Sequence, residues 1–171
     1  YMKSLINDND YCIRPYIIRS DGTPWYAEWE FHKHRPVFVT GVFNDYLGFG
    51  TGESVIRSIV KNDRHFSNDL HRRVYKKSKK KINRLIVVEN RWGQGRFHTH
   101  MILETPEHLS GEDYQHLIRK SWLRTRNGVD TEIKSEEVIF DEVGLKNYLF
   151  KEVSPYSDTG VDVENSYISR V

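Results

Sequence analysis

Apolar and polar positions recur along the chain in two different periods, and these periods predict the order of the secondary-structure elements. Residues 35–44 (RPVFVTGVFN) form an apolar, β-branched run that predicts a strand buried on both faces. From about Glu53 to Lys77 the apolar residues recur every three or four positions, which predicts an amphipathic helix. Its apolar face would carry Val55, Ile59, Phe66, Leu70 and Val74.

A hairpin and a second helix are expected next. Residues 82–89 (INRLIVVE) and 96–104 (RFHTHMILE) predict two strands joined by the Gly-containing turn NRWGQG. A helix should run from Ser110 to about Arg124, because Ser110 can cap its N-terminus and Asp113 follows three residues later, as in a capping box.

The last part of the pattern completes an α+β fold. Residues 129–140 alternate as a half-exposed strand, and Asp141 opens a final helix that must end before Pro155. The order is β-α-β-β-α-β followed by a helix. This order matches the ferredoxin-like (RRM-like) arrangement, in which an antiparallel sheet carries helices on one face and the other face is free for a site.

Three regions are expected around this core. Residues 1–35 are an N-terminal extension that looks like an added hairpin, and residues 36–153 form the domain itself. Residues 154–171 are polar and poor in aliphatic side chains, which predicts a tail or linker.

Composition limits the class of protein. A length of 171 residues suits one domain with a real core. The single cysteine, Cys12, cannot form a disulfide within a monomer, which favours a reducing compartment. No apolar run approaches the ~18 residues of a membrane span, and no signal-peptide pattern is present. We therefore expect no membrane partner and an intracellular protein, cytoplasmic in a prokaryotic host.

Positive charge is concentrated in one segment. Between Glu53 and Arg84 there are eleven Lys and Arg against three Asp and Glu, a net +8, which leaves −6 for the rest of the chain. The centre of this segment is the lysine run Lys76, Lys77, Lys79, Lys80 and Lys81. Such a run can follow a phosphate backbone, and it is equally typical of a solvated helix end and turn.

Two histidines and a glutamate suggest a metal site. Because side chains alternate along a strand, His98 and His100 share one face of the sheet. Glu89 can join them from the preceding strand if the register is right, since a one-residue slip would turn it to the other face. Two imidazoles and a carboxylate suit Mg²⁺, Mn²⁺ or Zn²⁺ with positions left open. A hydrogen-bonded structural role for the pair is the alternative.

The final helix supplies a tyrosine beside its apolar stripe. With Leu145, Leu149 and Val153 on that stripe, Tyr148 lies at its border and Lys151 lies one turn further along the same side. A tyrosine in this position can reach toward the sheet. Most tyrosines at such a border have only a packing role, with the ring against apolar side chains and the hydroxyl in contact with solvent.

Three stretches, taken in order, resemble the motifs of the HUH endonucleases, and specifically of the single-tyrosine replication initiators (Rep) of rolling-circle plasmids and viruses. FVTGVFN (38–44) resembles the first motif, HTHMILE (98–104) the paired-histidine motif, and YLFKE (148–152) the Tyr-x-x-Lys motif. The resemblance covers about residues 36–153. One departure is Thr99, where the family usually has a bulky apolar residue; threonine also suits a strand.

The resemblance implies a mechanism and a set of site residues. His98, His100 and Glu89 would hold a divalent metal, Mn²⁺ or Mg²⁺, against the scissile phosphate. Tyr148 would attack that phosphate and form a covalent 5′-phosphotyrosine, while Lys151 would supply positive charge. Nicking and rejoining would be one reversible step.

The implied substrate is single-stranded DNA or an origin hairpin, with a host or fused helicase as a further partner. Contacts to DNA are expected from the lysine run and from Arg91, Trp92 and Arg96. Three alternatives remain: a non-catalytic single-strand-binding module of the same fold, a small single-tyrosine HUH transposase, and a hydrolase that uses activated water, with only Glu104 or Glu152 as a general base.

Overall fold

The computed structural model describes residues 13–14, 35–44, 53–90, 97–134, 160–162 and 164–167. Within these residues six strands form one antiparallel sheet, in the order β1-β6-β3-β4-β2-β5. The strands are β1 (Ile13–Arg14), β2 (Pro36–Phe43), β3 (Arg84–Asn90), β4 (Phe97–Glu104), β5 (Gly128–Lys134) and β6 (Gly160–Asp162). Helix α2 (Glu53–Tyr75) connects β2 to β3, and helix α3 (Gly111–Leu123) connects β4 to β5.

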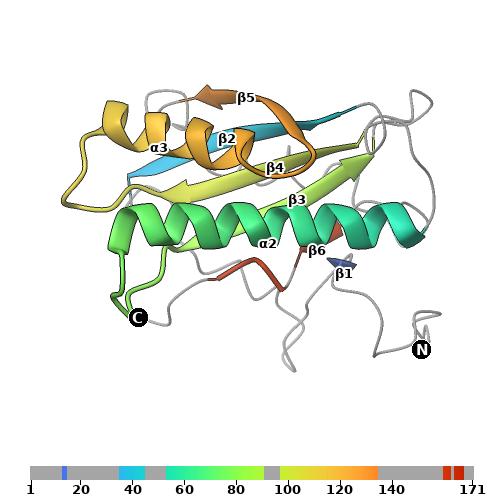
Figure 1. Ribbon diagram of the computed structural model, residues 1–171, viewed down its shortest axis with the longest axis horizontal. Helices are drawn as coiled ribbons and strands as arrows, with labels where there is room; N and C mark the ends of the chain where they lie inside the picture. The colour runs from blue at the N-terminus through green and yellow to red at the C-terminus, as the bar shows by residue number, and fades with distance from the viewer. Residues whose placement is uncertain are drawn as a thin grey trace, which may run out of the picture.

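The four central strands and both helices follow the predicted order. Along the chain they run β2-α2-β3-β4-α3-β5, and in the sheet the strand order is β3-β4-β2-β5. Both helices lie on the same face of the sheet (Figure 1). The predicted α+β class is thus confirmed, and the strand order is compatible with the ferredoxin-like arrangement. The final helix and, apart from β1, the N-terminal extension up to residue 34 lie outside the described residues.

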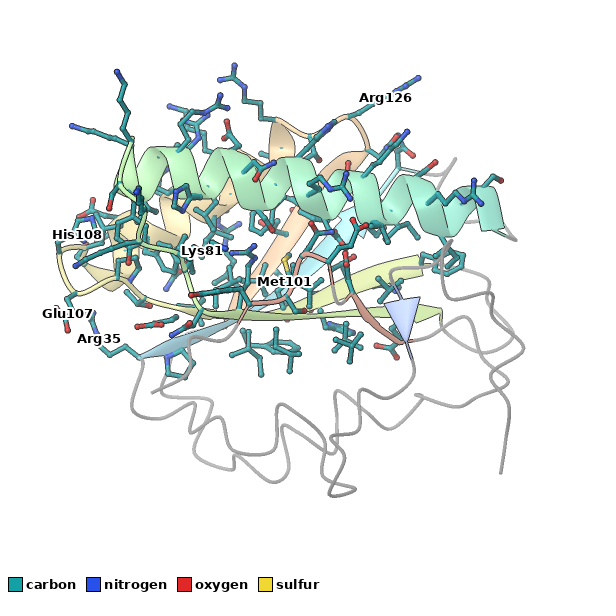
Figure 2. All side chains as sticks on the ribbon, turned by 90° about the horizontal axis from the view of Figure 1, so that it is seen from below. Arg35, Lys81, Met101, Glu107, His108 and Arg126 are labelled. Carbon is teal, nitrogen blue, oxygen red and sulfur yellow. The ribbon has the colours of Figure 1, made fainter. Side chains whose placement is uncertain are left out.

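The main core fills the space between the sheet and the helices. All five residues predicted for the apolar face of α2 are buried there: Val55, Ile59, Phe66, Leu70 and Val74. They pack against strand residues such as Val39, Ile86 and Met101. Met101 points from the sheet toward the helix layer (Figure 2), so its neighbours in sequence, His100 and Ile102, face away from the helices.

Both helix ends have local causes. Helix α2 ends at Tyr75 because Lys76 adopts a left-handed backbone with φ 54°, where its N–H donates to the carbonyl of Arg72 over 3.0 Å. Helix α3 begins after Ser110, whose hydroxyl accepts from the N–H of Asp113 over 3.0 Å, as predicted. Neither of these two described helices has an apolar stretch long enough to cross a bilayer.

Gly41 allows α3 to approach β2 closely. A Cβ atom at this position would lie 2.5 Å from the ring of Trp122, which is fully buried. The indole N–H of Trp122 donates to the carbonyl of the next residue, Val42, over 3.2 Å. The glycine in FVTGVFN is therefore explained by packing of the second helix.

Part of the predicted tail belongs to the sheet. Residues 160–162 form β6, which pairs with β3 through Val87 and Val161, and Val161 is fully buried. Further along, the backbones of Arg84 and Tyr167 exchange two hydrogen bonds of 2.7 and 2.8 Å. The polar composition of residues 154–171 suggested no such element, because three residues are too few to show a period.

Candidate active site

The register between β3 and β4 brings the predicted metal ligands to one face. Glu89 lies directly opposite His98, and His100 lies two residues further along β4, opposite Val87. Residues opposite each other in an antiparallel pair share a face, so Glu89, His98 and His100 project from the same side. This face of the sheet is opposite to the one on which α2 and α3 lie.

Hydrogen bonds hold the ring of His100 from two neighbouring strands. Its Nε2 makes a short hydrogen bond to the carboxylate of Glu89 on β3. Its Nδ1 lies 3.1 Å from the hydroxyl oxygen of Thr40 on β2. The ring of Phe38 stacks on His100 with centroids 5.5 Å apart. The orientation of this imidazole is therefore fixed by three side chains.

His98 lies next to His100 on the same face of β4. Its ring is nearly parallel to that of His100, at an interplanar angle of 10° and a centroid distance of 6.4 Å. On the other side of β4 its partner is Val42 of β2. His98 is half-buried, so of the two imidazoles it is the one more accessible to solvent.

The face around the site is buried rather than open. Glu89 and His100 are each only 7% exposed. The apolar residues of the same face are buried as well: Phe38, Leu85, Val87 and Ile102. The expectation of a free face therefore does not hold at these positions, because the strands carry apolar residues on both sides. A buried setting strengthens the interaction between Glu89 and His100.

The donor set fits a divalent cation in chemistry. It offers two imidazoles and a carboxylate, which are ligands for Mg²⁺, Mn²⁺ or Zn²⁺. In the part of the chain that the structure describes, no three His, Cys, Asp or Glu side chains already converge on one point. His100 and Glu89 contact each other directly, and the centroid of the His98 ring lies 6.4 Å from that of His100. The metal site remains a prediction.

The predicted nucleophile and several predicted DNA contacts are not among the described residues. These are Tyr148, Lys151, Arg91, Trp92 and Arg96. The five lysines of the run are described and exposed, in the turn between α2 and β3. Glu89 lies five residues beyond the start of β3, which is about 17 Å at ~3.3 Å per residue. The lysine run and the histidines are thus at opposite ends of β3.

Sequence reasoning missed two features near the histidines. One is Thr40, whose role was hidden inside an apolar motif. The other is Asp63 on α2, which is fully buried and accepts a 3.3 Å hydrogen bond from Thr99, the residue between the two histidines. A signal for Asp63 existed: it lies four residues after Ile59, on the apolar face of the predicted helix.

Asp63 is paired with a second buried carboxyl, Asp162 of β6. Burial and then the Asp162 carboxyl raise the pKa of Asp63 well above its usual value. Burial also raises the pKa of Asp162 to about 6, although hydrogen bonds from Asn165 act in the opposite direction. Arg64 lies near enough to favour the ionised form of Asp162.

Comparisons with models of protein families, with curated proteins and with solved structures found no match. The site contributes one fact that the motifs lack, namely the register that sets Glu89 opposite His98.

Proposed function

We propose that this protein is a replication-initiator endonuclease of the HUH class, which nicks single-stranded DNA at an origin and can rejoin it. One observation carries the proposal. Glu89, His98 and His100 share one face of the sheet, and the Glu89 carboxylate bonds the His100 ring. These are the three residues that the motif resemblance implies as metal ligands, and the register brings them to one face.

The three residues are suited to holding Mn²⁺ or Mg²⁺. Glu89 brings the negative charge, while His98 and His100 bring neutral nitrogen ligands. The cation, when bound, would neutralise charge on the scissile phosphate. Fixed rings cost little entropy on binding, and His100 is already fixed by Thr40 and Phe38.

Tyr148 is the proposed nucleophile, on the strength of the Tyr-x-x-Lys motif. Its phenolic oxygen forms a bond to phosphorus, and the bond from phosphorus to the 3′ oxygen breaks. The phenolic proton leaves, and the 3′ oxygen gains a proton to become a free 3′-hydroxyl. Because a phenol has an ordinary pKa of ~10, nearby positive charge from Lys151 would help it react at neutral pH.

The lysine run would bind DNA at a distance from the chemistry. Its exposed side chains lie at the end of β3 opposite to Glu89. They would contact phosphates several nucleotides away from the scissile one, or a flanking hairpin. Recognition and cleavage would then use separate surfaces.

The test is formation of a covalent complex between protein and DNA. The full chain is incubated with a randomised pool of end-labelled single-stranded oligonucleotides and Mn²⁺, and denaturing gels detect labelled protein. We expect an adduct that requires the cation and disappears in Tyr148→Phe, His98→Ala and His100→Ala. His116→Ala is the matched control, because His116 is exposed on α3, on the helix side of the sheet.

Other outcomes identify the alternatives. Binding of the oligonucleotides without any adduct would identify a non-catalytic module. Cleavage that survives in Tyr148→Phe would identify a hydrolase that uses water. Either result contradicts the proposed function.

A further inference from the structure

Thr40 has a contact that the proposed metal site would use. It lies directly opposite His100 in the pairing of β2 with β4, and its hydroxyl oxygen is 3.1 Å from Nδ1 of the ring. Glu89 bonds the other ring nitrogen from the opposite strand. The imidazole thus bridges a hydroxyl and a carboxylate across three strands.

The chemistry of the two partners differs. An ionised carboxylate only accepts hydrogen bonds, so the bond to Glu89 places a proton on Nε2 of His100. In a neutral ring Nδ1 is then an acceptor, and the Thr40 hydroxyl must donate to it. A cation that replaces the Nε2 proton reverses this need, because the remaining ring proton then sits on Nδ1 and requires an acceptor.

A hydroxyl group meets both requirements, since it can rotate to donate or to accept. A main-chain carbonyl could serve only the second state. The side chain is held in place because Thr40 is β-branched and lies in the middle of β2, between strands β4 and β5. His100 is only 7% exposed, so water is poorly placed to substitute for the hydroxyl.

We propose that Thr40 is a positioning residue for His100: its hydroxyl follows the ring proton from Nε2 to Nδ1 and so presents Nε2 to a divalent cation. This inference rests on the proposed function, because it concerns the same site. Outer hydrogen bonds of this kind typically change metal affinity by ~10- to 100-fold. Thr40 therefore contributes to the site without touching the metal or the DNA.

The experiment compares three variants by calorimetric titration with Mn²⁺ and Zn²⁺. Thr40→Val removes the hydroxyl and keeps the shape, whereas Thr40→Ser keeps the hydroxyl. Thr131→Val is the control, because Thr131 is a buried threonine that pairs with Gly41 on the helix-facing side of the sheet. We expect a 10- to 100-fold loss of affinity in Thr40→Val, recovery to near wild type in Thr40→Ser, and no change in Thr131→Val.

Two results would overturn the inference. Equal affinity in Thr40→Val and wild type would show that the hydroxyl is not needed. Equal losses in Thr40→Val and Thr40→Ser, with native circular dichroism, would show that keeping the hydroxyl does not preserve affinity, so the loss would not come from the hydroxyl.

A second readout separates this inference from the proposed function. Long-range ¹H–¹⁵N NMR of the metal-free protein reports the ring nitrogens of His100. The Nδ1 resonance should move in Thr40→Val and stay in place in Thr40→Ser. If wild type binds neither cation, the proposed function fails, and an unmoved Nδ1 resonance in Thr40→Val would independently reject the role of Thr40.

Discussion

At the residue scale, strand β4 carries polar side chains on both faces of the sheet. Thr99 points into the helix side and bonds the buried Asp63, while His98 and His100 on either side of it face away from the helices. Strand β4 is therefore held on its helix side by the bond between Thr99 and Asp63. On the other face, Thr40 of β2 and Glu89 of β3 hold the His100 ring. A threonine at this position, unusual for the family that the sequence resembles, has a use in this protein.

Glu89→Gln should weaken divalent-cation binding. The change keeps the shape and one hydrogen-bond acceptor but removes the negative charge that attracts the cation. We expect at least a tenfold higher Kd for Mn²⁺ by calorimetry, with the folded structure preserved. Glu104→Gln is the control, since Glu104 lies at the other end of β4. An unchanged Kd in Glu89→Gln would remove this residue from the site.

The buried pair of Asp63 and Asp162 should make stability depend on pH. Both pKa values are raised, to about 6 for Asp162, so the folded protein holds protons more tightly than the unfolded chain. The contribution of these two carboxyls to stability is therefore greatest below the ordinary aspartate pKa of ~4, and it is lost as the pH rises through their raised pKa values. For Asp162 this contribution is lost mostly between pH 3.8 and about 6.

Asp63→Asn should flatten this dependence. An amide can still accept from Thr99 and carries no charge, so we expect a more stable protein at pH 8, by about 1 to 3 kcal/mol in urea unfolding. Asp69→Asn is the control of opposite sign. Burial acts to raise the pKa of Asp69, but hydrogen bonds from Arg73 and Arg72 outweigh burial and lower this pKa. Loss of the Asp69 carboxylate should therefore destabilise the fold more at neutral than at acid pH. A pH slope unchanged by Asp63→Asn would contradict the role of the pair.

At the scale of elements, the packing of α3 on β2 depends on the absence of a side chain at position 41. Gly41→Ala would place a methyl group 2.5 Å from the Trp122 ring, and the ring is held by its bond to Val42. We expect a loss of about 1 to 3 kcal/mol in the free energy of unfolding. Gly111→Ala, at the start of α3, is the control, because no atom lies within 4 Å of the added carbon. Equal effects of the two substitutions would contradict this packing.

The order of the elements could be predicted from the sequence, but the way in which the strands meet could not. The long periodic runs gave β2, α2, β3, β4 and α3 with small errors at their ends, because burying one face of a helix or both faces of a strand leaves a strong period. The register of β3 on β4 is different. A shift of one residue would leave the apolar pattern acceptable on both faces, so only the structure places Glu89 opposite His98.

Two further features had different reasons for being missed. Strand β6 has three residues, too few to show alternation, and its position depends on contacts with distant residues such as Asn165 with Val60. Thr40 lies in an apolar run that predicts a buried strand, and its hydrogen-bond partner, His100, is 60 residues away in the chain. Contacts between distant residues of this kind leave no local pattern.

At the scale of the whole molecule, the charged turn and the histidine face are separated along β3. Changing Lys76, Lys77, Lys79 and Lys80 together to Gln should therefore weaken binding of single-stranded DNA without altering the affinity for Mn²⁺. Lys81 is left in place because its ammonium lies over the ring of Tyr167 at 4.7 Å. If all four lysines contact phosphates, the slope of log K against log salt should become shallower by up to about 3.

Lys120→Gln is the control for nonspecific charge, because this lysine is exposed on α3. Salt dependence that is unchanged in the fourfold variant would show that the turn is only a solvated helix end. A drop in Mn²⁺ affinity in the same variant would contradict the separation of the two surfaces.

The proposed function requires that a tyrosine attack a phosphate beside Glu89, His98 and His100. Its most direct test is peptide mass spectrometry of the protein after incubation with single-stranded DNA and Mn²⁺ and digestion of both. We expect a nucleotide attached through its 5′ phosphate to Tyr148, formed with Mn²⁺ and absent after chelation. Attachment at another residue, or strand cleavage that leaves every tyrosine unmodified, would contradict the proposed function.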